Sequence, residues 1–373
     1  MTNRTPIASL AAAALAAVAL MSCGGDDEPA AQATAAAVPA TETQAAPAAA
    51  LSGVKEYLQE HTELLTSFTA EFAADAHAYY DLAEEAGFDY EALWNERADE
   101  LVPLLEGMKR AWIAGNPYYE RMEGVVAGTP SLAEYDVILD AGSSAAEDPE
   151  SAVPFDLELS DGTTLVQPGN LFNVTEGALW GTLPAELPQS TPADLDGNGT
   201  EDFGEVLPDA RLLLASAEAF DQYAGELAAS GGAWEPSESD AFTALVVMVP
   251  TMSEYFGQWK ESRFVLGSSS ESESFNVVSR LSDINDILTG LEVIFAGVEE
   301  RLADVDPAQA EQTGRELADL RAFVEDLYSQ ESSGERFAPE QAEVLGSEAQ
   351  ERATAIAGQV SQGAAELGVT IEQ

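Results

Sequence analysis

Apolar residues recur at intervals of three and four along most of the chain, which is the period of an amphipathic α-helix. The plainest stripe lies within residues 52–86 and consists of Val54, Leu58, His61, Leu65, Phe68 and Phe72. The same period predicts helices over residues 89–126, 212–227, 237–259 and 339–367. It also predicts a helix lined by Phe275, Val278, Ile284, Leu288, Leu291, Phe295 and Val298. The chain is therefore predicted to be all-α.

The helical period is interrupted in the middle of the chain. Residues 155–166 alternate apolar and polar side chains around Asp161-Gly162, which predicts a short β-hairpin that we expect to be the only sheet. We therefore expect two packed helical bundles, the first over about residues 51–182 and the second over about 206–373, with a loop at 194–205 between them.

One short helix is predicted just after the hairpin, within residues 168–181. Asn170 is suited to cap it, and Leu171, Phe172, Leu179 and Trp180 would give it a buried side. Two polar residues of this helix, Asn173 and Glu176, are three apart and would point the same way. Such a pair fits a metal or ligand site, and it equally fits a capped, half-exposed helix.

A calcium-binding pattern follows this helix. Residues 194–205 match D-x-[DN]-x-[DN]-G-x₅-E at every defined position, with Gly199 at the sharp turn. The predicted ligands are Asp194, Asp196, Asn198, Thr200 (through its carbonyl), Asp202 and Glu205. Hard oxygen ligands in this number suit Ca²⁺ better than Mg²⁺. We expect a single structural Ca²⁺ that pins the connection; the alternative is an ordinary acidic surface turn.

The first 50 residues are predicted to target and tether the protein. Residues 1–22 have a basic start and a short apolar run, as a signal peptide does, and Cys23 follows at the expected cleavage position. Leu20-Met21-Ser22-Cys23 resembles a bacterial lipobox, which implies that Cys23 carries lipid. Residues 23–50 are rich in Ala and Pro, carry a few acids and lack apolar periodicity, which predicts a disordered tether. An unlipidated signal peptide is the alternative.

The charge of the chain is extreme. There are 15 Lys and Arg against 67 Asp and Glu, a formal net charge of −52. A surface of this sign repels nucleic acid, so we expect no nucleic-acid partner. It fits a solvated acidic face suited to a saline habitat, and it also fits a surface that collects cations.

The chain has few histidines, and their positions limit the kinds of site that they can form. The only two histidines, His61 and His77, lie 16 residues apart, which places them about 160° apart around one helix. They cannot share a ligand there, so the sequence does not favour a histidine-rich zinc site or a Ser-His-Asp triad.

Three segments resemble the imelysin-like family, which includes the EfeO-type lipoproteins of bacterial iron uptake. Residues 172–180 match the family motif Phe-His-x-x-Glu-x-x-Leu-Trp at Glu176, Leu179 and Trp180, with Asn173 in place of the histidine. Residues 111–123 are similar to a Trp…Tyr-Glu-Arg-hydrophobic-Glu segment, and residues 135–141 resemble Leu-Asp-x-x-Ile-Asp-Ala. These segments bring in further acids, Glu123, Asp136 and Asp140.

The resemblance implies an imelysin-like helical domain over residues 51–373 that handles metal ions, with iron as the expected metal. It implies Asn173, Glu176, Glu123 and Asp140 as ligands. The protein would be lipid-anchored in the cell envelope, facing the periplasm or exterior, with envelope transport proteins as partners. Asn is a weaker donor than imidazole, so transition-metal affinity should fall.

Two other functions stay open at this point. The protein could be a structural or interaction lipoprotein in which the metal site has degenerated and calcium only stabilises the fold. It could also be an imelysin-type peptidase, although the sequence shows no cysteine nucleophile or zinc triad, so we expect a protein that is not an enzyme.

Overall fold

The computed structural model describes residues 48–272 and 274–372. The predicted signal peptide, Cys23 and most of the predicted tether lie outside the described residues. None of the described helices is both long and apolar enough to cross a lipid bilayer.

Most of the described chain is helical, which confirms the all-α prediction. The longer helices are α1 (Ala48–Glu85), α2 (Tyr90–Val126), α4 (Leu171–Trp180), α5 (Ala210–Ala233), α6 (Glu238–Met248), α7 (Met252–Glu261), α9 (Arg280–Val305), α10 (Pro307–Ser332) and α11 (Pro339–Leu367). Short turns of helix are α3 (Ala133–Asp136), a π-helix at Val137–Ala141, α8 (Arg263–Leu266) and two 3₁₀ turns at Val249–Thr251 and Gly267–Ser269.

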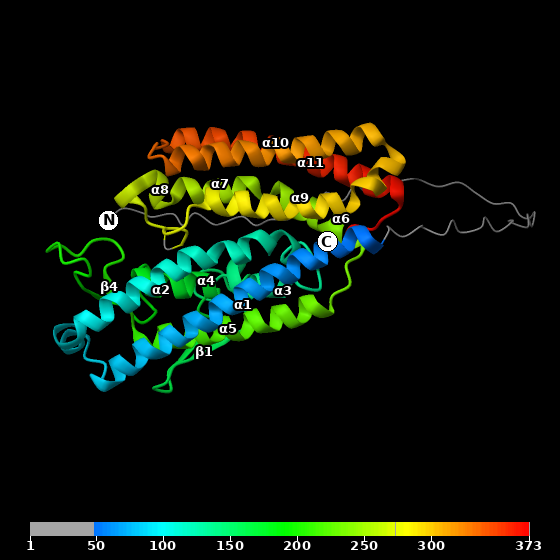
Figure 1. The fold of residues 1–373 in the computed structure, drawn as a ribbon. Coiled ribbons are helices and arrows are strands. Elements are labelled where there is room, and N and C mark those ends of the chain that lie inside the picture. Colours follow the sequence, from blue (N-terminus) through cyan, green and yellow to red (C-terminus); the bar gives the residue numbers. More distant parts are fainter. Residues whose placement is uncertain (1–47, 273, 373) are drawn as a thin grey trace, which may run out of the picture. The chain divides into compact units, whose positions relative to one another are not determined.

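Helix α9 is the element shared by the early and the late helices. In the first group α1 packs against α2 and α5, and in the second α11 packs against α6, α7 and α10 (Figure 1). Helix α9 packs against α1 and α2 on one side and against α6, α7 and α10 on the other. A side chain near the start of α9 can therefore meet side chains from both groups.

An aromatic cluster fixes α4 against the first group. The Phe172 ring of α4 lies 5.0 Å from Phe220 of α5, 5.3 Å from Trp112 and 5.5 Å from Tyr119 of α2, measured between ring centroids. Tilted and edge-on aromatic contacts of this kind add to the burial of apolar area. They hold α4, which carries the family motif and which we call the motif helix, against α2 and α5.

The sheets are small. The predicted hairpin is confirmed: β1 (Asp156–Glu158) pairs antiparallel with β2 (Thr164–Val166), with Leu157 opposite Leu165. The expectation that it is the only sheet was wrong. Strands β3 (Thr191–Pro192) and β4 (Val206–Leu207) also pair, because the loop between them returns on itself; two residues are too few to show an alternating pattern.

The start of α9 also differs from the prediction. The apolar pattern placed Phe275 and Val278 on the helix, but α9 begins at Arg280. Phe275 has a φ of 55°, in the left-handed region, so it cannot continue a right-handed helix. The side chain of Ser279 instead accepts a hydrogen bond from Leu281 N at 3.3 Å and caps the helix.

Gly290 allows α9 to approach α2 closely. A methyl group on Gly290 would lie 2.2 Å from the carbonyl oxygen of Arg121, a backbone atom that cannot turn aside. The two helices must therefore separate if this glycine gains a side chain.

We predict that Gly290→Ala destabilises the fold by about 1–3 kcal/mol, because the added methyl group overpacks this crossing. Gly225→Ala in α5 is the matched control, since no atom lies within 4 Å of its methyl position. That variant should gain about 0.5–1 kcal/mol from the better helix propensity of Ala. Urea unfolding measures both. Equal effects of the two changes would contradict the close approach of α9 to α2.

Candidate metal centre

Asn170 joins the motif helix to the segment before the hairpin. Its side-chain oxygen accepts a hydrogen bond from Asn173 N at 2.8 Å, which caps α4, and its side-chain nitrogen donates to Gly142 O at 3.0 Å. Its backbone N–H donates to the same carbonyl at 3.1 Å. Asn170 therefore holds the first turn of α4 beside the end of the π-helix.

The π-helix carries Asp140 into the interior. Its wide turn closes with a hydrogen bond from Gly142 N to Val137 O at 3.0 Å. Only glycine fits at that closing position, because a methyl group on Gly142 would lie 2.2 Å from Val137 O. Such turns are rare and are often found at functional sites. Asp140 is 5% exposed, which is unusual for an aspartate.

Helix α2 presents a polar stripe to the same interior space. Asn116, Glu120 and Glu123 are spaced by four and then three residues, so they share one face, and all three are buried. The carboxylates of Glu120, Glu123 and Asp140 each place an oxygen within 4.8 Å of the others. These three residues, which we call the carboxylate triad, are close enough to ligate one metal ion.

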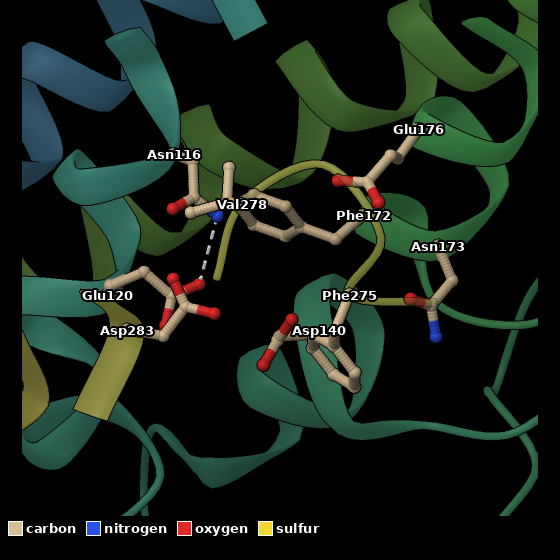
Figure 2. Close-up of a pocket in the computed structure, with 9 residues that line it drawn as sticks. All are labelled: Asn116, Glu120, Asp140, Phe172, Asn173, Glu176, Phe275, Val278 and Asp283. Atoms are coloured by element: carbon tan, nitrogen blue, oxygen red, sulfur yellow. Dashed lines mark hydrogen bonds between the residues drawn. The ribbon is translucent and has the colours of Figure 1, made fainter. Parts of the chain in front are cut away.

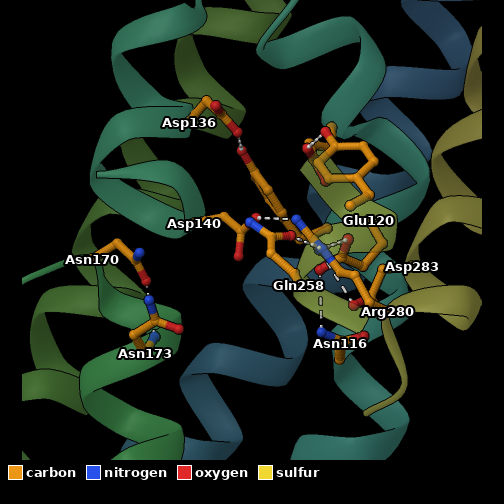
Figure 3. A network of polar contacts seen from close by, with 12 residues as sticks. Asn116, Glu120, Asp136, Asp140, Asn170, Asn173, Gln258, Arg280 and Asp283 are labelled. Atoms are coloured by element: carbon orange, nitrogen blue, oxygen red, sulfur yellow. Dashed lines mark hydrogen bonds and ion pairs between the residues drawn. The ribbon is translucent and has the colours of Figure 1, made fainter. Parts of the chain in front are cut away.

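Arg280, the first residue of α9, lies beside the triad. Its guanidinium is 3.5 Å from Glu120, 3.7 Å from Asp140 and 3.3 Å from Asp283, measured between nitrogen and oxygen (Figure 3). All four side chains are buried. A buried charge is costly unless it is compensated, and these ion pairs offset part of the cost of burying Arg280 and its three carboxylate partners.

Aromatic donors hold the other buried carboxylates. Tyr119 donates to Asp136 at 2.7 Å, Tyr255 donates to Glu123 at 2.7 Å, and the Trp112 indole N–H donates to Glu176 at 3.2 Å. Asp136 is not a member of the triad, and the Tyr119 hydroxyl group holds its carboxylate. The family-like acids Asp136 and Asp140 lie in one buried region, but they have different partners.

Several oxygens in this region accept no hydrogen bond although they are buried. They are Glu123 Oε2, Asn116 Oδ1 and Asp283 Oδ1, together with Glu120 Oε2, whose one close partner is the Arg280 guanidinium at 3.5 Å. Leaving such atoms without a partner costs about 1–3 kcal/mol each, and more for a charged group. A bound cation, or protons on the carboxyl groups, would remove this cost.

Burial and neighbouring charge make these carboxyl groups weak acids. Burial raises the pKa of Glu176 to about 7. Burial, together with the nearby Asp140 carboxylate, raises the pKa of Glu123 to about 7. Burial raises the pKa of Asp283 to about 8, although the Arg280 guanidinium acts in the opposite direction. One guanidinium therefore does not balance the negative charge of the cluster.

A pocket joins the triad to the motif helix. Figure 2 shows its side chains converging from α2, the π-helix, α4, the segment before α9 and the start of α9. The lining residues are Asn116, Glu120, Asp140, Phe172, Asn173, Glu176, Phe275, Val278 and Asp283. Of the predicted ligands, Asn173, Glu176 and Asp140 line this pocket, and Glu123 belongs to the triad without lining the pocket.

Sequence reasoning missed four residues of this centre: Asn116, Glu120, Asp283 and Arg280. The first two could have been found, since they precede Glu123 at helical spacing within a segment already recognised as family-like. Asp283 is not part of the apolar stripe that predicts this helix, and only the packing of α9 against α2 shows that it is buried.

The two histidines lie elsewhere. His61 is buried on α1, where its Nδ1 lies 2.9 Å from Tyr57 O and its ring contacts the Tyr57 ring at a tilt of 41°. His77 is half exposed and lies 3.0 Å from Glu218. Neither histidine lines the pocket, so every polar side chain that lines it offers oxygen or amide nitrogen atoms.

The predicted calcium loop folds so that its acids converge. Oxygens of Asp194, Asp196 and Glu205 lie within 4.8 Å of one another. Asn198 donates to Asp196 at 3.0 Å and to Asp202 at 3.2 Å, so these side chains gather on one side of the turn. Thr200 is in the same turn, and its N–H donates to Asn198 Oδ1 at 2.8 Å. The loop can thus hold a metal ion, with its ends closed by β3 and β4.

The predicted calcium loop also contacts α4. Gly204 has a φ of 82°, and a methyl group there would lie 2.4 Å from the Trp180 ring, so the backbone approaches the end of α4 closely. Lys109 of α2 is buried and donates to Gly204 O at 2.6 Å. The loop therefore contacts α2 and α4, two of the elements that supply the pocket.

The fold and the buried carboxylates together define an all-helical protein with an acidic interior centre able to ligate a metal ion. The family model for imelysin, peptidase family M75, matches residues 57–362, and the chain belongs to the imelysin family. No curated protein matches the chain.

The raised pKa of Glu176 predicts how stability depends on pH. The unfolded chain ionises this carboxyl near pH 4.3, whereas the folded protein does so at about pH 7. Between these values the folded state keeps a proton that the unfolded state has lost, so the stability from this group falls as the pH rises.

We predict that Glu176→Gln is more stable than the wild type at pH 8, by about 3 kcal/mol, and nearly equal to it at pH 4.5. Glutamine keeps an acceptor for the Trp112 indole and cannot ionise. Urea unfolding in chelator at both pH values measures the difference. A difference that does not change with pH would show that Glu176 is not a buried acid of raised pKa.

Proposed function

We propose that this imelysin-family protein is a surface-anchored lipoprotein that binds a metal ion in its interior pocket and serves metal uptake. One observation carries the proposal: three buried carboxylates lie within 4.8 Å of one another, and two of them have an oxygen without a hydrogen bond. A cation would satisfy these oxygens and offset the negative charge that Arg280 leaves unbalanced.

The proposed ligands are the predicted Glu123 and Asp140, together with Glu120. Asn173 and Glu176 would complete the site from α4. This donor set consists of oxygen atoms, which suit hard cations, whereas imidazole would favour borderline transition metals. Iron is the metal that the family implies, and its oxidised form is a hard cation. We therefore propose iron as the cargo, held more weakly by Asn173 than it would be by histidine.

We infer binding rather than hydrolysis. The pocket is lined by neither an imidazole nor a thiol, and its carboxylates are engaged with Arg280, Tyr255 and Trp112. Groups held in this way are suited to ligating an ion. Steady cleavage of casein by the pure protein, lost in Glu176→Ala, would contradict this inference.

The proposed location is the cell envelope. Lipid on Cys23 would anchor the chain to a membrane, residues 23–50 would act as the tether, and the helical domain would face the periplasm or exterior. Envelope transport proteins are the proposed partners, since a bound metal must be passed on. The acidic surface would raise the local concentration of cations.

A structural role is the second candidate. The observation that favours it is the guanidinium of Arg280, which already pairs with Glu120 and Asp140 and takes part of the role of a metal ion. In that case the pocket would be a degenerate metal site, and only calcium at residues 194–205 would bind, as a clip that stabilises the fold.

We predict that the wild type binds one transition-metal ion per chain in the pocket and that Glu123→Gln abolishes this binding, because the triad loses a charge. Asn173→His should raise the affinity for Zn²⁺ or Fe²⁺ by about tenfold or more, because imidazole is the better donor. Calorimetry with the calcium loop saturated measures both changes. Glu299→Gln, on the exposed side of α9, is the control for the loss of one charge.

The same measurement separates the two candidate functions. No binding in the wild type and none in Asn173→His would show that the pocket is not a metal site, and the structural function would stand. Binding that survives in Glu123→Gln would place the ion elsewhere on the acidic surface.

We predict that Ca²⁺ binds the loop with a dissociation constant of about 10⁻⁴–10⁻³ M and raises the melting temperature by a few degrees at 10 mM. Glu205→Gln should remove this effect, because it removes the expected bidentate ligand. Glu201→Gln, an acid of the same loop outside the ligand positions, should keep it. Equal responses in the two variants would mean that calcium acts through general charge screening.

A further inference from the structure

We propose that Arg280 is a positioning residue that keeps two carboxylates of the triad close enough to ligate one cation. The proposal rests on the proposed function, because it concerns the same pocket. Glu120 and Asp140 come from different elements, α2 and the π-helix, and as like charges they repel each other. The guanidinium pairs with both, at 3.5 Å and 3.7 Å.

Arg280 is held by groups that are not ligands. Its Nε donates to Gln258 Oε1 at 2.9 Å, and Gln258 lies on α7. Its guanidinium carbon lies 4.5 Å from the centre of the Tyr255 ring and 4.2 Å from that of Phe275. These cation–π contacts and the hydrogen bond fix the position of the charge without help from the triad. Arg280 can therefore act as a fixed point for the carboxylates.

The ion pairs leave oxygens free for a metal. Nitrogen–oxygen distances of 3.5 and 3.7 Å exceed the 2.7–2.9 Å that is usual for a charge-assisted hydrogen bond. Glu123 Oε2, in the triad, accepts no hydrogen bond, and neither does Asn116 Oδ1, which lines the pocket and is 6% exposed. Both atoms are buried, and neither is the oxygen that Arg280 pairs with in Glu120 or Asp140. Arg280 thus lies beside the cation position and leaves it open.

Two effects of Arg280 on a bound cation oppose each other. Its charge repels the cation directly, but it also attracts Glu120, Asp140 and Asp283 and counteracts their mutual repulsion. The guanidinium acts on three carboxylates at once, so we expect the attraction to decide the result. Removing groups that orient metal ligands commonly costs 10–100-fold in affinity.

The test measures Mn²⁺ binding by the full chain, with free Mn²⁺ followed by its electron paramagnetic resonance signal. The calcium loop is silenced in every variant by Asp196→Asn and Glu205→Gln, and 0.2 M salt suppresses binding to the surface. Mn²⁺ is a hard ion that prefers oxygen ligands. Arg280→Gln removes the charge at similar size, and Arg280→Lys keeps the charge.

We expect Arg280→Gln to weaken Mn²⁺ binding by about tenfold or more, and Arg280→Lys to recover most of that loss. Gln258→Leu, which removes only the hydrogen bond to the guanidinium, should weaken binding by a smaller factor. This variant decides the question if Arg280→Gln does not fold. Unchanged or tighter binding in Arg280→Gln, or in Gln258→Leu in its place, overturns the positioning role.

The result that would overturn the proposed function differs from the result that would overturn only the role of Arg280. If the wild-type pocket shows no Mn²⁺ binding that Glu123→Gln removes, the pocket is not a cation site, and the role of Arg280 falls with it. If Glu123-dependent binding is present and the Arg280 and Gln258 variants do not change it, only the positioning role is overturned.

Discussion

Six carboxyl groups and only one guanidinium of the described residues are buried together in the interior centre of this protein. This excess of acidic groups over basic groups is the constraint on which the other contacts of the centre depend. The carboxyl groups belong to Glu120, Glu123, Asp136, Asp140, Glu176 and Asp283, and the guanidinium belongs to Arg280. Charges removed from water are tolerated when they are paired, protonated or bound to a cation. Hydroxyl and indole donors satisfy some of the oxygens, and Arg280 satisfies others. The unpartnered oxygens that remain are the physical reason to expect a cation.

The contacts that position the elements of the site also cap helices or pack the core. Asn170 caps α4 and binds the end of the π-helix, so the motif helix and Asp140 are placed together. Phe172 anchors α4 in the aromatic cluster, and Gly204 lies against Trp180 at its other end. Calcium bound at residues 194–205 would therefore stabilise a loop that packs against α4, which lines the pocket. The fold thus builds the centre from α2, the π-helix, α4 and α9.

The sequence allowed the helices and the hairpin to be predicted, because 3.6-residue periodicity and an Asp-Gly turn are local signals. It also pointed to four residues that lie in or beside the pocket, through resemblance to a family motif. It could not show that Arg280 and Asp283 join them, because the pairing of α9 with α2 is a long-range contact without a local pattern. Phe275 was misplaced because its left-handed backbone, with a φ of 55°, leaves no mark in the apolar pattern.

The central claim is that the carboxylate triad ligates a metal ion, and a crystal structure of the chain grown with Mn²⁺ tests it most directly. The predicted result is an anomalous difference peak between Glu120, Glu123 and Asp140, with Arg280 still stacked between Tyr255 and Phe275. A peak at residues 194–205 alone, with the triad oxygens bonded only to one another or to water, would contradict the claim.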